Sequence, residues 1–456
     1  MVIVRKEKFN SEKSIQYISD KAEKTENKSG MEDLKLGAAI DIGTTSIAVG
    51  LFDMENEVLL GNLTQTNCQT KFGSDVMMRI MHCTNGKEQL LHDMLIEQIE
   101  NIITVIIEQN ISEKYKSYVV ERMTVVGNTT MCHIFLNRDV TGLSGAPFSM
   151  AYKGIANVNS KEVGLKKYII PEIIVLPNIH SHVGADAMSV LCNEKLYKKD
   201  VNEIAIDIGT NAEIILNRHG DVYVTSTAAG PAFEGKGIYS GIRAGAGAIN
   251  SIKISRVNGN IILGMLDDGT KQSPKGICGS GLIDAISELL KAGVLTKQEA
   301  VAANVNINLC NCLDNSDEKI EKYFVLSEKN KIIVTQKDIR NVQLAKGAIQ
   351  AGVEVLLEKA GITMNDIEKI KIAGVFGKFI HASSAMSFGL LPSYPDKIEF
   401  IGNAAGNGAA RALFDADFVK NTEKLTEEIR HIELADENDF QNKFLNAMEL
   451  KEWYYK

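Results

Sequence analysis

The sequence has 456 residues, of which 45% are hydrophobic and 24% are charged, values typical of two or three globular domains. Its formal net charge of −8 argues against nucleic acid as the main partner, and no apolar run is long enough to predict a membrane span. The odd number of cysteines, seven, and the lack of an apolar secretion signal at the N-terminus favour a reducing cytoplasm.

Composition divides the chain into four predicted segments. Residues 1–36 are rich in Lys, Glu, Ser and Asn, and we interpret them as a mobile leader with at most one short helix. Residues 37–198 and 199–420 are predicted to be the two halves of an ordered fold. Residues 421–456 are interpreted as a charged tail that ends in a helix over 439–453.

Apolar patterning predicts strands that alternate with helices in both halves, which indicates an α/β fold. In the first half we expect a strand hairpin around Asp41, a helix over 88–109, a strand over 123–135 and a glycine-containing strand end over 175–191. In the second half we expect a hairpin around Asp207, a glycine-rich stretch over 228–249, a long helix over 335–360, and strand-containing segments over 370–380 and 398–414. Antiparallel hairpins argue against a purely parallel sheet.

One motif occurs twice. Residues 39–53 read AIDIGTTSIAVGLFD and residues 205–216 read AIDIGTNAEIIL, so that Asp41 and Asp207 are 207 − 41 = 166 positions apart. A single Asp-x-Gly-Thr loop is equally compatible with a plain hairpin turn. Two loops at half-chain spacing predict a duplicated domain that closes around one ligand.

The chemistry of the two loops suits a nucleotide with a metal ion. Asp41 and Asp207 stand at strand ends, where carboxylates can hold a hydrated Mg²⁺. Glycine allows a close approach of the backbone to a ligand, and successive N–H groups with Thr hydroxyls can hold phosphate oxygens. Two further strand ends are GNTT, which contains Asn128, and GVFG over 374–377. Each is a weak signal of nucleotide binding alone, but their order along the chain relative to the two Asp-x-Gly-Thr loops strengthens both.

This order of loops resembles the actin, sugar kinase and Hsp70 superfamily of ATP-binding proteins. The resemblance implies two ribonuclease H-like domains, an actin-like ATPase fold, with ATP in the cleft between them. It also implies that Asp41 and Asp207 hold Mg²⁺, mostly through water. The residues implied to contact the phosphates are Gly43, Thr44, Thr45, Gly209, Thr210 and Asn211. Gly374 and Gly377 are implied to contact adenosine, and Asn128 is a further expected nucleotide-binding residue.

A narrower resemblance covers almost all of the chain from Leu36 onward. Segments such as LPNIHSHVGADAMSVL, AAGPAFEGKGIYSGIRAGAGAI, GICGSGLIDAI and IGNAAGNGAARAL are similar to the ATPase core of the reductive activators of corrinoid-dependent enzymes. The resemblance implies an ATPase that drives an electron onto cob(II)alamin of a corrinoid protein in a methyltransferase system. A homodimer is compatible with the sequence.

The chain departs from that family in its cysteines. Typical members carry an iron–sulfur domain, whereas no four-cysteine ferredoxin pattern occurs in this sequence. Cys310 and Cys312 are the only close pair, and we interpret them as free thiols rather than cluster ligands. Cys132, Cys192 and Cys278 are expected in the core. We therefore expect no iron–sulfur cluster and a separate low-potential electron donor.

Several other residues have two interpretations each. Glu234 is our candidate for a catalytic acidic residue near the γ-phosphate or its attacking water, or it caps a glycine-rich turn. Glu213 reaches the metal or, as we favour, pairs with a base. Asp186 lines the cleft or caps a helix, and Arg243 meets phosphate or a partner's acidic surface. His180 and His182 are metal ligands or, as we favour, ordinary polar residues.

Three functions fit these patterns. We favour an ATP-hydrolysing activator of a corrinoid protein. A small-molecule kinase of the same superfamily is the main alternative, although no base poised on a substrate hydroxyl is evident. The third is an ATP-gated scaffold that binds corrinoid proteins without turnover.

Overall fold

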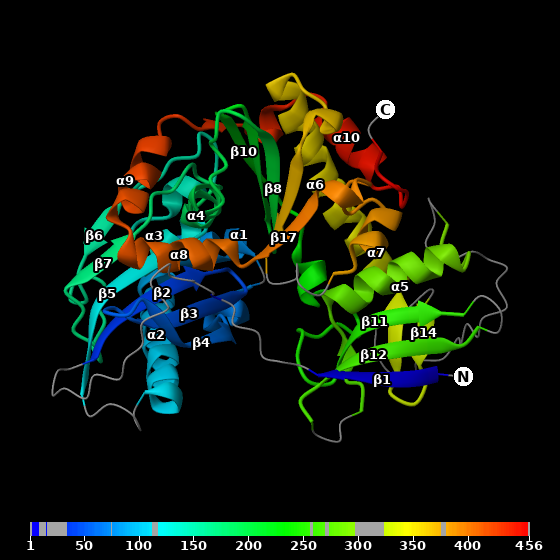
Figure 1. Ribbon diagram of the computed structural model, residues 1–456, viewed down its shortest axis with the longest axis horizontal. Helices are drawn as coiled ribbons and strands as arrows, with labels where there is room; N and C mark the ends of the chain where they lie inside the picture. Colours follow the sequence, from blue (N-terminus) through cyan, green and yellow to red (C-terminus); the bar gives the residue numbers. More distant parts are fainter. Residues whose placement is uncertain are drawn as a thin grey trace.

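The computed structural model describes residues 2–8, 15, 34–73, 75–111, 117–255, 259–269, 273–296, 323–374 and 380–454. Two α/β halves stand beside each other, and a smaller unit with a four-stranded sheet lies below the second half (Figure 1). Each half is built on a six-stranded sheet. No helix in the described part of the chain is long and apolar enough to cross a bilayer.

The sheet of the first half has the strand order β4-β3-β2-β5-β7-β6. Its strands are β2 (Leu34–Ile42), β3 (Ser46–Asp53), β4 (Val58–Thr66), β5 (Tyr118–Gly127), β6 (Ala156–Val158) and β7 (Glu172–Val175). The helices of this part of the chain are α1 (Val76–His82), α2 (Glu88–Asn110), α3 (Thr129–Phe135) and α4 (Ala185–Asn193).

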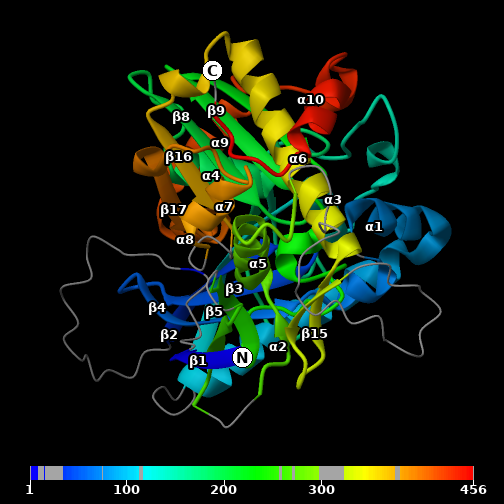
Figure 2. The same ribbon diagram turned by 90° about the vertical axis from the view of Figure 1, so that its right-hand side faces the viewer.

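The sheet of the second half has the order β17-β16-β8-β9-β10-β18. Its strands are β8 (Asn202–Ile208), β9 (Ala212–Arg218), β10 (Asp221–Thr227), β16 (Lys369–Ala373), β17 (Ile398–Gly402) and β18 (Arg430–His431). The helices are α6 (Gln336–Ala360), α7 (Ala382–Ser387), α8 (Ala404–Phe414), α9 (Ala416–Leu425) and α10 (Phe440–Ala447). Figure 2 shows α6 along this sheet with α10 packed beside it.

The two sheets repeat one topology, which confirms the predicted duplication. In the first, β4, β3 and β2 form an antiparallel meander, and β5 and β7 add in parallel beside β2. In the second, β10, β9 and β8 form the meander, and β16 and β17 add in parallel beside β8. Asp41 stands opposite Val126 and Asp207 stands opposite Ala373, so the two aspartates occupy equivalent positions.

The smaller unit is inserted between β10 and α6. It contains β11 (Ala248–Ile254), β12 (Ile261–Asp267), β13 (Gly276–Ile277), α5 (Gly279–Lys291), β14 (Tyr323–Ser327) and β15 (Ile332–Thr335). Its sheet also contains β1 (Val2–Lys8), which pairs in parallel with β12 along seven residues. The expectation of a leader with at most one helix is therefore wrong for these residues, because their β-branched start, Val-Ile-Val, favours a strand at a sheet edge over a solvated coil.

A second correction concerns the expected strand over 123–135. The strand ends at Gly127, and α3 begins directly after it because the Asn128 side chain accepts a hydrogen bond from the Met131 N–H. All seven residues of α3 are buried, so the sequence lacks the polar face that normally identifies a helix. The two long helices, in contrast, lie at their predicted positions, as α2 and α6.

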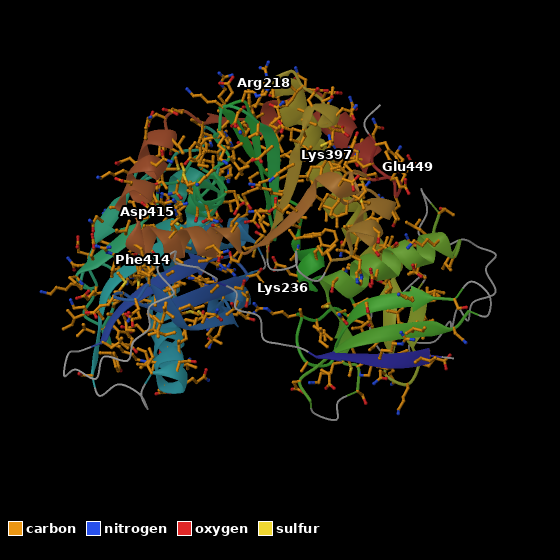
Figure 3. The ribbon with its side chains drawn as sticks, viewed as in Figure 1. Arg218, Lys236, Lys397, Phe414, Asp415 and Glu449 are labelled. Atoms are coloured by element: carbon orange, nitrogen blue, oxygen red, sulfur yellow. The ribbon has the colours of Figure 1, made fainter. Side chains whose placement is uncertain are left out.

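Helix α8 follows β17 of the second sheet in sequence but packs against the first sheet. The hydroxyls of Thr124 and Ser189 donate to carbonyls of α8 at 2.6 and 2.7 Å. Phe52 of β3 meets Phe414 edge to face, with ring centroids 5.9 Å apart. Figure 3 labels Phe414 and Asp415 at the junction of α8 and α9 over the first half. The chain therefore returns from the second sheet to the first half at α8. The packing of α8 on the first half restrains how the two halves sit relative to each other.

Candidate functional site

The two Asp-x-Gly-Thr loops meet between the halves. The hydroxyl oxygens of Thr45 and Thr210, one from each loop, are 3.0 Å apart. A backbone hydrogen bond closes each loop, from the Gly43 N–H to the Ser46 carbonyl at 2.8 Å in the first and from the Gly209 N–H to the Asn211 carbonyl at 2.9 Å in the second, which is one residue shorter. The structure thus brings together two motifs that lie 166 positions apart in the sequence.

A glycine stands behind each loop at the end of the neighbouring parallel strand. A Cβ atom on Gly127 would lie 2.5 Å from the carbonyl oxygen of Ile42, and one on Gly374 would lie 2.7 Å from that of Ile208. Gly374 also has a φ of +102°, which strongly favours glycine. The strand end of GVFG is therefore at the predicted place, while Gly377 lies outside the described residues.

Asn128 connects the first loop to α3. Its side-chain N–H donates to the Thr44 hydroxyl at 2.9 Å while its oxygen caps α3. The same loop is held from the other side, where the Asn67 side chain donates to the Gly43 carbonyl at 2.9 Å. The two asparagines therefore hold the first loop from both sides, one through its Thr44 side chain and one through its Gly43 backbone.

Four carboxyl groups gather around the two loops. Burial raises the pKa of Asp41 to about 6, although a hydrogen bond from Asn403 at 3.0 Å opposes the rise. Burial, then the charges of Asp186 and Asp41, raise the pKa of Asp207 to about 8. Burial raises the pKa of Asp186 to about 7 and that of Glu213 well above its ordinary value, and the charges of their carboxyl neighbours add to both shifts.

Such a cluster of buried acids fits a cation. No three of these carboxylates offer oxygens within 4.8 Å of one another in the described chain, which suits an ion that keeps much of its water shell. Together with the tight glycine positions, this fits ATP with Mg²⁺. The assignment of Asp41 and Asp207 as metal-holding residues stays a prediction.

Glu234 lies beside the second loop. Its Oε1 accepts from the Thr210 hydroxyl at 2.8 Å, and its Oε2 is buried without a hydrogen-bond partner among the described residues. Burial lowers the pKa of Lys236 and of Arg243, and the nearby Glu234 carboxylate opposes this effect. Figure 3 shows Lys236 between the first half and the inserted unit. The Arg243 guanidinium reaches the Thr66 hydroxyl of the first half at 3.4 Å.

Comparison with known proteins identifies the family. Residues 202–455 match the family model described as the C-terminal domain of RACo, the ASKHA domain, and residues 36–199 match the RACo middle region. The chain belongs to the RACo family. It is 34% identical over 424 residues to the corrinoid activation enzyme RamQ of Eubacterium limosum, across 90% of this chain and 69% of that protein.

Two further relatives agree with this placement. The [Co(II) methylated amine-specific corrinoid protein] reductase of Methanosarcina barkeri is 27% identical over 452 residues, across 91% of this chain and 77% of that protein. The solved structure of a reductive activator for a corrinoid, iron–sulfur protein matches with a TM-score of 0.81 and 31% identity, across 93% of this chain and 67% of that chain. The resemblance to reductive activators and the actin-like ATPase fold are therefore confirmed.

Several residues of this RACo site are missed or assigned differently by the sequence patterns. Asn403 bonds to Asp41 and also caps α8, since its oxygen accepts from the Gly406 N–H at 2.8 Å. Its only sequence signal is an Asn between a strand and a glycine-rich helix. Glu213 bonds to Ser226 at 3.2 Å and interacts with acids, so the preference for a basic partner is not supported.

The remaining candidates lie outside the two loops. Cys132, Cys192 and Cys278 are buried, as expected for core residues, while Cys310 and Cys312 lie outside the described residues. His182 meets the ring of Phe148, with ring centroids 4.6 Å apart. His180 stacks on His431 of β18, with ring centroids 3.8 Å apart.

Proposed function

We propose that this RACo-family chain is an ATP-dependent reductive activator that returns a corrinoid protein from cob(II)alamin to cob(I)alamin. The observation that carries the proposal is the contact between the two Asp-x-Gly-Thr loops, one from each half. The relatives of this chain are named for corrinoid activation and for corrinoid-protein reduction. Mg²⁺ is proposed as the metal partner of ATP.

Each part of the site has a task in this proposal. Asp41 and Asp207 would hold the hydrated metal, and the backbone of the two Thr loops would hold phosphates. Bound ATP supplies free energy through hydrolysis of its terminal phosphate. Glu234 would orient water through its Oε2 atom, since its Oε1 atom accepts a hydrogen bond from Thr210.

The two loops belong to different halves, so a ligand that contacts both favours one relative position of the halves. ATP binding and loss of phosphate would thereby change the surface that the corrinoid partner meets. A one-electron potential shifts by about 59 mV for each 1.4 kcal/mol. A change of a few kcal/mol in partner contacts would therefore shift the potential of the corrinoid by on the order of 100 mV.

The reduction itself transfers one electron to cobalt and needs a donor of low potential. None of the seven cysteines forms a ferredoxin-type pattern, and the described cysteines are free. We propose that the electron comes from an iron–sulfur centre outside these 456 residues.

The proposal is tested by what stimulates ATP hydrolysis. We expect a corrinoid protein with cob(II)alamin to accelerate phosphate release, and a panel of hydroxylated or carboxylated metabolites to have no effect. A metabolite that accelerates hydrolysis and is recovered phosphorylated would instead establish the kinase. Tight ATP binding without hydrolysis, both with and without corrinoid protein, would instead support the ATP-gated scaffold.

A further inference from the structure

A second cluster of side chains that could ligate a metal ion, none of them among the four acids around the two loops, lies where the two halves touch. His180 comes from the segment between β7 and α4, and His431 and Glu433 come from β18 and the residues just after it. Each of these residues offers one ligand atom, and these atoms all lie within 4.8 Å of one another. All three side chains are partly exposed, so that an ion can enter from solvent.

Two polar atoms of this cluster have no hydrogen-bond partner in the described part of the chain. The Nδ1 atom of His180 and the Oε2 atom of Glu433 are both buried and make no hydrogen bond to any described residue. Glu433 precedes the short helix Leu434–Asp436 but does not cap it with its side chain. A buried polar atom without a partner is costly, and a bound ion would remove the cost at both atoms.

The backbone on both sides is fixed. The carbonyl of His180 accepts from the Thr129 hydroxyl at 2.7 Å, and its N–H donates to the Val183 carbonyl at 2.9 Å. The Ile432 N–H donates to the Val224 carbonyl at 2.9 Å, and its own carbonyl accepts from the Thr225 hydroxyl at 2.8 Å. An ion would therefore be bound by rotation of side chains on a fixed backbone. The stacked rings must tilt apart to direct both lone pairs at one ion, and the terminal torsion of His allows this.

We propose that His180, His431 and Glu433 bind one divalent transition-metal ion, with zinc as the preferred ion. Two imidazole nitrogens and a carboxylate oxygen suit zinc, whereas Mg²⁺ prefers oxygen ligands alone. Tetrahedral zinc ligands lie about 3.3 Å apart, so small side-chain movements complete the site. The fourth position is left for water.

The ion would join the two halves, because one ligand belongs to the first half and two belong to the edge of the second sheet. The His180 segment is itself connected to the nucleotide loop, since Thr129 follows Asn128, which holds Thr44. Occupancy of the metal site is therefore linked to the relative position of the halves.

The test is a zinc titration of untagged protein that has been stripped with a chelator. Zinc is titrated against a chromophoric chelator in excess Mg²⁺, which occupies the acidic cluster. We expect one equivalent of tightly bound zinc in the wild type. We expect Glu433→Gln and His431→Gln each to bind zinc at least about tenfold more weakly. Removing a residue that only hydrogen-bonds to a metal ligand already costs about this much metal affinity, and removing a ligand should cost no less. Co²⁺ in place of zinc should give the intense visible bands of a four-coordinate site.

His219→Asn is the matched control. His219 is exposed on a turn with a φ of +49°, which Asn tolerates, and it lies outside the cluster. Its zinc affinity should equal that of the wild type, and metal-free thermal unfolding of every variant shows whether it has folded. Less than half an equivalent in the wild type, unchanged affinity in the two ligand variants, or an equal loss in His219→Asn would each overturn the proposal.

Discussion

Replacement of Asp207 by Asn should stabilise the nucleotide-free protein while removing its stabilisation by Mg·ATP. Among the described contacts the Asp207 carboxylate makes no side-chain hydrogen bond, and burial with the charges of Asp186 and Asp41 raises its pKa to about 8. An Asn of the same shape removes the charge and leaves the packing unchanged. The site thus holds an acid that is unfavourable for the fold and useful for a cation.

The magnitude follows from proton linkage. The carboxyl of Asp207 has its ordinary pKa of 3.8 in the unfolded chain and a pKa of about 8 in the folded protein. Between these pH values the folded state holds more protons, so the contribution of Asp207 to stability falls as the pH rises. At pH 7 a fully buried group would lower the free energy of unfolding by about 4 kcal/mol. Because solvent reaches part of Asp207, we expect about 2 kcal/mol.

Urea unfolding at pH 5 and pH 8, with and without Mg·ATP, measures both effects. Without ligand, Asp207→Asn should be more stable than the wild type, and the gain should be larger at pH 8. With ligand at about 100 times its Kd, the wild type should gain about 2.7 kcal/mol, and the variant should gain almost nothing. An apo variant less stable than the wild type, or an equal gain with ligand, would refute the reasoning.

Three further outcomes are expected. Asn403→Ala should weaken Mg·ATP binding and lower stability by about 1 kcal/mol, because it removes both the bond to Asp41 and the cap of α8; calorimetry and urea unfolding measure the two losses. Gly127→Ala should be destabilised by its clash with the Ile42 carbonyl, whereas Gly145→Ala, which meets nothing within 4 Å, should unfold like the wild type. Iron and acid-labile sulfide assays on this chain should find no stoichiometric cluster, and a stoichiometric one would contradict the external donor.

The fold is largely predictable because it is duplicated. The Asp41 and Asp207 motifs repeat a strand, a turn and a second strand, and each copy supports the other. Helices α2 and α6 are predictable from their long apolar periodicity. The strand β1 is not, because seven residues of a short segment with charged neighbours carry a weak signal, and its partner β12 lies more than 250 positions away.

The meeting of the two loops that carry Asp41 and Asp207 is predictable because both loops have the same motif. The roles of these residues stay predictions. Contacts that arise only through tertiary packing are not predictable. Asn403 reaches Asp41 only because α8 crosses to the first sheet, a contact 362 positions apart. Glu433 and His180 meet only because β18 adds to the edge of the second sheet next to the first half. No local pattern encodes either contact.

We propose that ATP on this chain drives one electron onto a corrinoid. Electron paramagnetic resonance measures it directly, because cob(II)alamin has an unpaired electron and cob(I)alamin has none. With a low-potential reductant, the cob(II)alamin signal of the partner should disappear only when wild-type protein and Mg·ATP are both present, and should persist with Asp207→Asn. A signal that persists with the wild type and Mg·ATP, or disappears equally without ATP, would contradict the account.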